Sequence, residues 1–207
     1  INQGRVLYRE IWDNKPPILY LIYALFNGDQ FYARILSLIF GALSVIAFYF
    51  LARKIFKSGR SLYVSTVLFA IIFGLPLVEG NIANSENFMI LPTILGFYLV
   101  FSTKEKIKFL ATFVAGILLS FAFLTKIVAV FDLAALFVII FILKLPDALS
   151  FSSSALKNQI KTIVTGLEQE TVLIIGFIIP IFLTILYLLF AEALPDFYRA
   201  VFSQNVG

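Results

Sequence analysis

Long runs of apolar residues, separated by short polar segments, restrict the possible folds of this chain more than any other feature. A bilayer core of about 30 Å is crossed by roughly 20 consecutive apolar residues in a helix. In hydrocarbon, backbone N–H and C=O groups must be paired within the chain, so a crossing segment of this length is helical. Only 14% of the residues are charged, whereas soluble domains carry about 25%. We therefore expect an all-α, polytopic membrane protein.

The pattern predicts about six transmembrane helices and one interfacial helix. The apolar run 17–26 is too short to cross a bilayer, so we expect it to lie in the interface. Polar segments are predicted to form an outer loop over residues 1–16, a connector over 145–170 and an outer segment over 191–207. The predicted spans cover approximately residues 31–54, 62–78, 88–102, 109–124, 127–143 and 171–190.

Two further expectations follow from the limits of these segments. Only Thr125 and Lys126 separate two of the spans, which predicts a tight hairpin. No signal-like segment precedes the first loop. We therefore expect the chain to be the central part of one transmembrane domain, with an N-terminal span and a C-terminal part lying outside it.

The distribution of basic residues predicts the orientation in the membrane. Ten basic residues fall on the side of the loops around 53–60, 104–108 and 144–161, and six fall on the other side. Cytoplasmic loops carry an excess of Lys and Arg, so the first side is expected to be cytoplasmic. The loops that contain Lys15, Glu86, Lys126 and Arg199 should then converge on the outer surface.

Composition also excludes several classes of site. The chain has no Cys and no His, so zinc sites of the usual kind and a His general base are excluded. The net charge is +4 without a block of basic residues, which does not indicate nucleic-acid binding.

The segment Trp12-Asp-Asn-Lys-Pro-Pro17 is the polar stretch most typical of a binding site. Its two prolines fix two φ angles, remove two backbone donors and favour the first turn of a helix. Lys15 is thereby placed where a helix begins, and there an ammonium and backbone N–H groups can bind one anion, most commonly a phosphate. The alternative is a solvated loop with a proline helix start, because short motifs often match by chance.

Four segments together resemble the bacterial GT-C membrane glycosyltransferases. The similarity is to the groups that include the dolichyl-phosphate-mannose protein mannosyltransferases and the aminoarabinose transferase of lipid A, and it covers most of the chain. The segments are Gly4 to Pro17 (GRVLYREIWDNKPP), Ala33-Arg34 opening a span, Asn84-Ser-Glu86 before another span, and Leu124-Thr-Lys126 in the hairpin.

This resemblance implies a GT-C-like fold and a defined reaction. A sugar passes from a polyprenyl phosphate to a lipid, polysaccharide or protein acceptor at the outer face of a membrane, expected here to be a bacterial plasma membrane. It implies that Lys15 meets the lipid phosphate and that Glu86 is the acid of the second outer loop. The carboxylate that activates the acceptor is expected before Ile1, just after the preceding span. The family often has Tyr-Arg-Asp where this chain has Tyr8-Arg9-Glu10, with Tyr8 as a supporting residue.

The chemistry of the reaction selects candidate residues. Displacing a polyprenyl phosphate needs a cation near the leaving oxygens and a base near the acceptor hydroxyl. We expect direct displacement with inversion at the sugar carbon. Nothing in the sequence requires a cofactor or a metal, although an acidic loop pair could hold a divalent ion. The candidate carboxylates are Glu86, Asp13 and Glu10, and the candidate phosphate-binding cations are Lys15, Lys126, Arg34 and Arg199.

Several candidates also have a structural interpretation. A Glu at a helix start, such as Glu86, is favoured by the helix macrodipole. Arg34 could pair with the loop carboxylate of Asp29. The run Phe197-Tyr198-Arg199 suits a helix that lies in the interface.

Three further acidic residues can likewise have either a structural or a functional role. Glu10 and Asp13 share a face only if their loop is helical, and are otherwise rim charges. Asp132 lies inside a predicted span, where an acid costs about 2.5 to 3.5 kcal/mol on insertion scales and needs a partner. Lys126 precedes it by roughly 9 Å of helix rise, so pairing requires Lys126 to reach into the membrane. A structural ion pair, a polar pocket and a part in binding are all open.

Two other function classes remain as alternatives to a glycosyltransferase. A transporter or flippase of a lipid-linked substrate should place ionisable residues near the midplane on several spans, whereas here, apart from Asp132, they gather at one surface. A non-catalytic scaffold with the same fold would keep the phosphate-facing residues without the base.

Overall fold

The computed structural model describes residues 1–2, 4–56, 58–75, 82–102, 107–148 and 155–203, with side chains described outside 143–166. Some charges used to predict the orientation lie outside these described residues: Lys57, Lys104, Lys106, Glu79 and the side chains of Lys144, Lys157 and Lys161.

The described elements are helices, and no strand is found among the described residues, which confirms the all-α prediction. A 3₁₀ turn over Ile127–Ala129 separates two of the helices, and a short π-helical segment, Arg199–Ser203, follows the last one. The α-helices are α1 (Pro17–Ala24), α2 (Gln30–Ile55), α3 (Gly59–Gly74), α4 (Ser85–Ser102), α5 (Lys108–Thr125), α6 (Val130–Ala148), α7 (Ala155–Phe190) and α8 (Leu194–Tyr198).

Within the described residues, four helical segments are long and apolar enough to cross a membrane: α2, α4, α5 and the Leu167–Phe190 part of α7. The apolar helices Gly59–Gly74 and Ile127–Ile142 are shorter. An apolar helix overlaps each of the six predicted spans, and the short helix α1 lies where the interfacial helix is predicted. Residues 76–78 of the predicted span 62–78 lie outside the described residues.

The polar connector predicted over 145–170 differs from the structure. α6 continues to Ala148, and α7 begins at Ala155 and runs for 36 residues without interruption. A helix of that length is roughly 54 Å long, longer than the hydrocarbon core, so part of it must lie outside the core. The predicted connector contains Lys, Gln, Glu and Ala, which are good helix formers, and the helix therefore continues where the apolar sequence ends.

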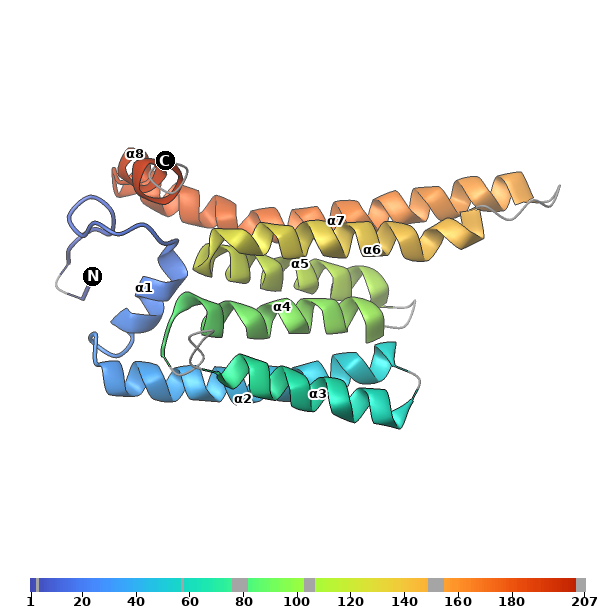
Figure 1. The fold of residues 1–207 in the computed structure, drawn as a ribbon. Coiled ribbons are helices and arrows are strands. Elements are labelled where there is room, and N and C mark those ends of the chain that lie inside the picture. The colour runs from blue at the N-terminus through green and yellow to red at the C-terminus, as the bar shows by residue number, and fades with distance from the viewer. Residues whose placement is uncertain (3, 57, 76–81, 103–106, 149–154, 204–207) are drawn as a thin grey trace.

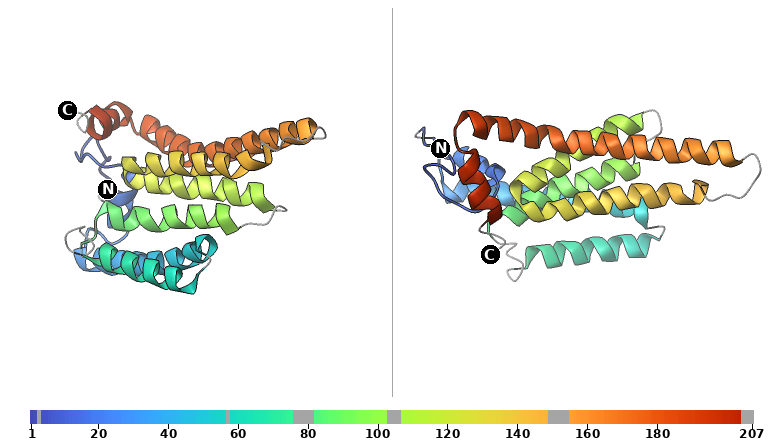
Figure 2. Two further views of the ribbon diagram at one scale, coloured as in Figure 1. Left: turned by 45° about the vertical axis from the view of Figure 1, so that its right-hand side comes forward. Right: turned by 90° about the horizontal axis from the view of Figure 1, so that it is seen from above.

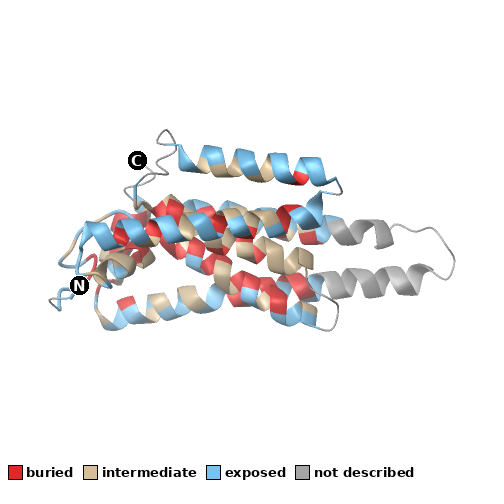
Figure 3. Cartoon of the chain, turned by 90° about the horizontal axis from the view of Figure 1, so that it is seen from below, coloured by how far each residue is buried: buried red, intermediate tan, exposed pale blue. Residues whose placement is uncertain are grey.

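The helices pack side by side in the order α3, α2, α4, α5, α7, α6. Figure 1 shows them as a stack of roughly parallel rods with α4 and α5 in the middle. One core cluster joins Ala115 and Leu119 of α5 to Leu173 of α7 and Leu136 of α6. In Figure 3 the buried residues concentrate in the middle of the bundle, and α3 contributes the single buried residue Leu62 among its described residues.

The close crossing of α5 and α7 depends on two glycines. A Cβ on Gly116 would meet the carbonyl oxygen of Leu173, and a Cβ on Gly176 would meet that of Phe113, both far inside van der Waals contact. Small residues allow two helix backbones to approach in this way, which is a common means of association in membranes.

The connections that we assigned to the outer face gather at one end of the bundle. The two termini, α1, the start of α4, the α5–α6 hairpin and α8 lie together at the left of Figure 1. Figure 2 shows the same grouping in two further views. Since helices that follow one another in the chain run in opposite directions, alternate loops meet at this end, as predicted.

Substituting Gly116 by Ala should weaken the fold. The added methyl group has to push the two backbones apart, and over-packing of this kind typically costs about 1 to 3 kcal/mol. Thermal unfolding in detergent should show a clearly lower midpoint for Gly116→Ala. Gly59→Ala is the matched control, because its added methyl group meets nothing within 4 Å. Equal midpoints for the two variants would contradict the role assigned to the crossing.

Candidate functional site

The first loop is held against the end of the bundle by a buried apolar cluster. Leu7 and Tyr8 are 4% and 2% exposed, and they pack with Leu188 of α7, Phe197 of α8 and Val201. The ring of Tyr8 lies edge-on to that of Phe197, with 5.0 Å between ring centroids. The loop that carries the Lys-Pro-Pro motif is thereby positioned by the C-terminal end of α7 and by α8.

Lys15 is held through its backbone while its side chain stays exposed. The hydroxyl of Tyr8 donates a hydrogen bond to the Lys15 carbonyl oxygen at 2.7 Å. The Lys15 N–H donates to the hydroxyl of Tyr20 on α1 at 3.3 Å. Pro17 begins α1 directly after Pro16, as the motif predicts. The Lys15 ammonium forms no ion pair with any described residue.

Glu86 and Lys126 form an ion pair at the same end of the bundle. Glu86 lies in the first turn of α4, and the Lys126 ammonium contacts its Oε1 atom from the end of α5. The Ser85 hydroxyl donates to the other carboxylate oxygen of Glu86 at 3.0 Å. The side chains of Lys126 and Glu86 are 33% and 37% exposed, so water still reaches the pair.

Hydrogen bonds from three elements place the start of α4. Asn84 accepts a hydrogen bond from the Asn87 N–H at 3.3 Å, in the manner of a helix cap. The Asn87 side chain donates to Ser37 of α2 at 3.1 Å. The Tyr23 hydroxyl of α1 donates to the Ala83 carbonyl oxygen. Glu86 is therefore presented by a segment tied to both α1 and α2.

An apolar cavity of about 270 Å³ lies between α1, α2, α4 and α5. Its lining is almost entirely hydrocarbon and includes Phe88 and Thr125, which stand close in the chain to Glu86 and Lys126. Ile18, three residues after Lys15, lines the same cavity. This cavity is thus lined by residues of α1, which follows the Lys15 motif, and of the helices that carry Glu86 and Lys126.

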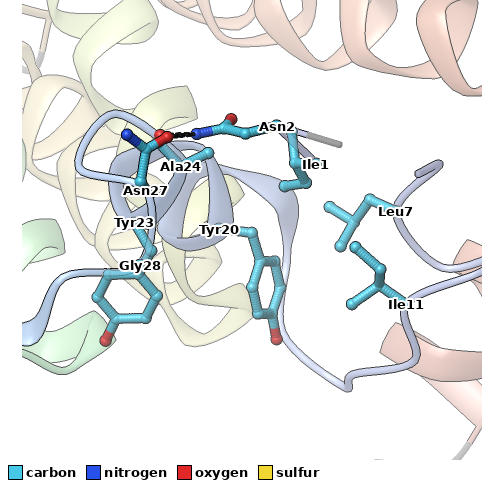
Figure 4. Close-up of a pocket in the computed structure, with 9 residues that line it drawn as sticks. All are labelled: Ile1, Asn2, Leu7, Ile11, Tyr20, Tyr23, Ala24, Asn27 and Gly28. Atoms are coloured by element: carbon cyan, nitrogen blue, oxygen red, sulfur yellow. Dashed lines mark hydrogen bonds between the residues drawn. The ribbon is translucent and has the colours of Figure 1, made fainter. Parts of the chain in front are cut away.

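Two further cavities, with more polar linings than the first, adjoin α1 on the loop side. The larger, about 560 Å³, is lined by Asn2, Leu7, Tyr20, Tyr23 and Asn27 among others. Figure 4 shows the Tyr20 and Tyr23 rings pointing the same way from α1, and the Asn2 amide bonded to Asn27. The smaller, about 300 Å³, contains Arg34 and shares Tyr23 with the first.

Arg34 and Arg199 stand apart from the ion pair. Asp29 caps α2 by accepting from the Phe31 N–H at 2.8 Å, and no Arg34–Asp29 ion pair forms among the described residues. Arg34 instead faces the smaller polar cavity. Arg199 is exposed at the end of α8 and forms no ion pair with a described residue.

The other acidic candidates have local partners. The first loop is not helical, so the condition for Glu10 and Asp13 to share a helical face is not met. Glu10 accepts from the Val6 N–H at 2.7 Å and braces the loop. Asp13 accepts from the Asn14 N–H at 2.6 Å. Asp132 lies near Thr93 of α4 in the first turn of α6, whereas the Lys126 ion pair is made with Glu86.

Sequence reasoning missed Tyr20, Tyr23 and Glu192. Tyr20 lies one helical turn after the proline pair, which is the signal that could have identified it. Burial raises the pKa of Tyr8 and of Tyr20, and Asp13 adds to both shifts. Both phenols therefore remain protonated donors. Glu192 pairs with Arg9 at 3.2 Å and links the loop to the segment after α7.

No group of three Asp, Glu, His or Cys side chains that could hold a metal ion is present in the part of the chain that the structure describes. The described charged side chains at this end are therefore either single groups or members of the two ion pairs, and they do not form a set of metal ligands.

Comparison with known proteins finds one family. The family model of the dolichyl-phosphate-mannose-protein mannosyltransferases matches residues 11–193. This match covers the proline motif, the Glu86–Lys126 pair and the helices between them, and it confirms the resemblance seen in the sequence. No curated protein and no solved structure matches the chain.

The Glu86–Lys126 pair should contribute measurably to stability. Lys126→Met leaves the Glu86 carboxylate without its cation, and for a pair that is partly exposed to water we expect a loss of about 1 kcal/mol. The double variant Glu86→Gln with Lys126→Met should lose less than the sum of its two single variants. Thermal unfolding in detergent measures both. Arg9→Met, which breaks a pair with 51% and 79% exposed side chains, is the control and should change little.

Proposed function

The chain belongs to the dolichyl-phosphate-mannose-protein mannosyltransferase family, and on that premise we propose that it transfers a sugar from a polyprenyl-phosphate donor to an acceptor. We place the reaction at the extracytoplasmic face of a bacterial plasma membrane. The acceptor is a lipid, a polysaccharide or a protein. The observation that carries the proposal is the exposed Lys15 ammonium, which shares one end of the bundle with the Glu86–Lys126 pair and an apolar cavity.

The proposed donor matches the two kinds of surface at this end. An isoprenoid chain is pure hydrocarbon, as is the lining of the apolar cavity that includes Ile18, Phe88 and Phe121, so this cavity suits a part of the chain. Its phosphate would then lie where Lys15 and Lys126 extend toward water. A cation near the leaving oxygens stabilises the charge that develops as the sugar–phosphate bond breaks. Arg34 and Arg199 add positive charge around the same end.

The mechanism we propose is a single displacement with inversion, without a metal or another cofactor. The acceptor oxygen attacks the sugar carbon, the carbon–oxygen bond to the phosphate breaks, and the electron pair leaves with the phosphate. The acceptor proton passes to a carboxylate. Among the described candidate carboxylates, Glu86 forms an ion pair with a candidate cation, Lys126.

The position of the charges favours a transferase over a transporter. The described ion pairs Glu86–Lys126 and Arg9–Glu192 both lie at the loop end of the bundle. Asp132 is in the first turn of α6 and so belongs to that end as well. A transport path would need ionisable groups near the middle of several spans.

Lys15→Ala should lower the rate of transfer by about 100-fold, the loss expected when one stabilising donor to a developing anion is removed. The measurement is release of polyprenyl phosphate from polyprenyl-phosphate mannose in membranes that contain the variant. Lys15→Arg keeps the charge and should retain more activity than Lys15→Ala. Lys54→Ala, the same change at the end of α2 far from the loop, is the control. Full activity of Lys15→Ala would contradict the proposed role.

The proposed orientation can be tested because the chain has no Cys. Arg5→Cys and Arg60→Cys are matched changes at exposed arginines at opposite ends of the bundle. A membrane-impermeant thiol reagent added to intact cells should label Arg5→Cys and leave Arg60→Cys unlabelled until the membrane is opened. The reverse pattern would put the site on the cytoplasmic face.

A further inference from the structure

We propose that Tyr8 and Tyr20 are positioning residues that clamp the backbone of Lys15 from both sides, so that its ammonium meets the lipid phosphate at a fixed place. This inference rests on the proposed function, in which Lys15 binds that phosphate. The clamp consists of two phenol hydroxyls, one on the carbonyl and one on the N–H of the same residue.

The two hydrogen bonds use both backbone groups that Lys15 has. Tyr8 donates to its carbonyl oxygen at 2.7 Å, and Tyr20 accepts from its N–H at 3.3 Å. Pro16 and Pro17, which follow, have no N–H groups and cannot brace the loop by donating to it. A proline also restricts the residue before it to extended conformations. Little freedom therefore remains at the Lys15 Cα, and the side chain alone can move.

Each tyrosine is itself held by a different part of the fold. Tyr8 is 2% exposed and packs on Phe197, and its backbone is in the left-handed region with φ +72°. A left-handed conformation is unfavourable for a bulky residue and persists only where the surroundings impose it. Tyr20 belongs to α1, and the two rings lie edge to face with centroids 6.4 Å apart. Lys15 is thus fixed both to α8 and to α1.

Asp13 lies beside the clamp. The Tyr20 hydroxyl accepts from the Lys15 N–H at 3.3 Å. Burial raises the pKa of Tyr20, and Asp13 adds to the shift, so the hydroxyl keeps its proton. Asp13 stands two residues before Lys15 and accepts from the Asn14 N–H at 2.6 Å, so it braces the loop that carries Lys15.

If Tyr8 and Tyr20 only fill the core, substituting them should affect phosphate binding differently from what a clamp predicts. Tyr→Phe removes one oxygen atom and keeps the ring, so the packing on Phe197 remains. If the tyrosines only fill space, the loss of a hydroxyl should affect phosphate binding equally whether or not Lys15 is present. If they act through Lys15, the effect should disappear once the ammonium is removed, because only coupled residues give non-additive effects.

The experiment measures the affinity of the purified protein in detergent for polyprenyl phosphate, which lacks the sugar and needs no acceptor. The variants are Tyr8→Phe, Tyr20→Phe, Lys15→Ala and the two doubles with Lys15→Ala. Each Tyr→Phe change should weaken binding about fivefold in the Lys15 background, the effect of one hydrogen bond. In the Lys15→Ala background each should change it less than about twofold. Tyr32→Phe, an exposed tyrosine of α2, is the matched control and should bind as the unchanged protein.

The outcomes separate the two proposals. If Lys15→Ala weakens binding and Tyr8→Phe and Tyr20→Phe do not, the clamp is wrong and the phosphate role of Lys15 stands. If the Tyr→Phe effects persist undiminished in the Lys15→Ala background, the tyrosines act independently of Lys15 and the clamp is also wrong. If Lys15→Ala binds normally, the proposed function fails first. Unfolding midpoints of all variants check that the fold is kept, and Tyr20→Phe retains the test if Tyr8→Phe unfolds.

Discussion

An unpaired backbone N–H or C=O group costs several kcal/mol in hydrocarbon, so each crossing segment of this chain has to be a helix with its charges at the ends. Helices that follow one another in the chain then run in opposite directions, and alternate connections meet at one end of the bundle. This constraint brings together the first loop, the start of α4, the α5–α6 hairpin and α8, although they are far apart in the sequence. The Glu86–Lys126 contact, between residues 40 positions apart, follows from it.

The same reasoning explains which features could be predicted from sequence. Helix positions follow from apolar runs, and the convergence of Lys15, Glu86 and Lys126 at one end follows from counting those runs. Neither argument predicts the distances between these side chains. The extension of α7 to Ala155 was missed because helix propensity, rather than hydropathy, decides where a helix ends outside the hydrocarbon. The partners of individual side chains were harder to predict than the helix positions. Asp29, for example, caps α2 instead of pairing with Arg34.

Tyr8 and Tyr20 illustrate a different limit. Tyrosines are expected at membrane interfaces because of their amphipathic rings, so their presence near a loop is not informative by itself. Their function depends on which backbone atoms their hydroxyls reach, and that is a property of the loop path between Tyr8 and Pro16. The left-handed backbone of Tyr8 shapes this path, and no pattern in the sequence predicts it, because left-handed positions usually select Gly or Asn.

Lys15 and Lys126 carry the same charge but differ as candidate ligands of the proposed phosphate. Lys126 already contacts a carboxylate, so an incoming phosphate would have to compete with Glu86 for its ammonium. Lys15 has no ion pair among the described residues and loses only water when it binds. Its backbone is fixed in advance, so less conformational freedom is lost on binding, which is the general advantage of preorganisation. Under the proposed function, binding of the phosphate by Lys15 therefore leaves the Glu86–Lys126 pair intact, and that pair holds the start of α4 against the α5–α6 hairpin while the phosphate departs.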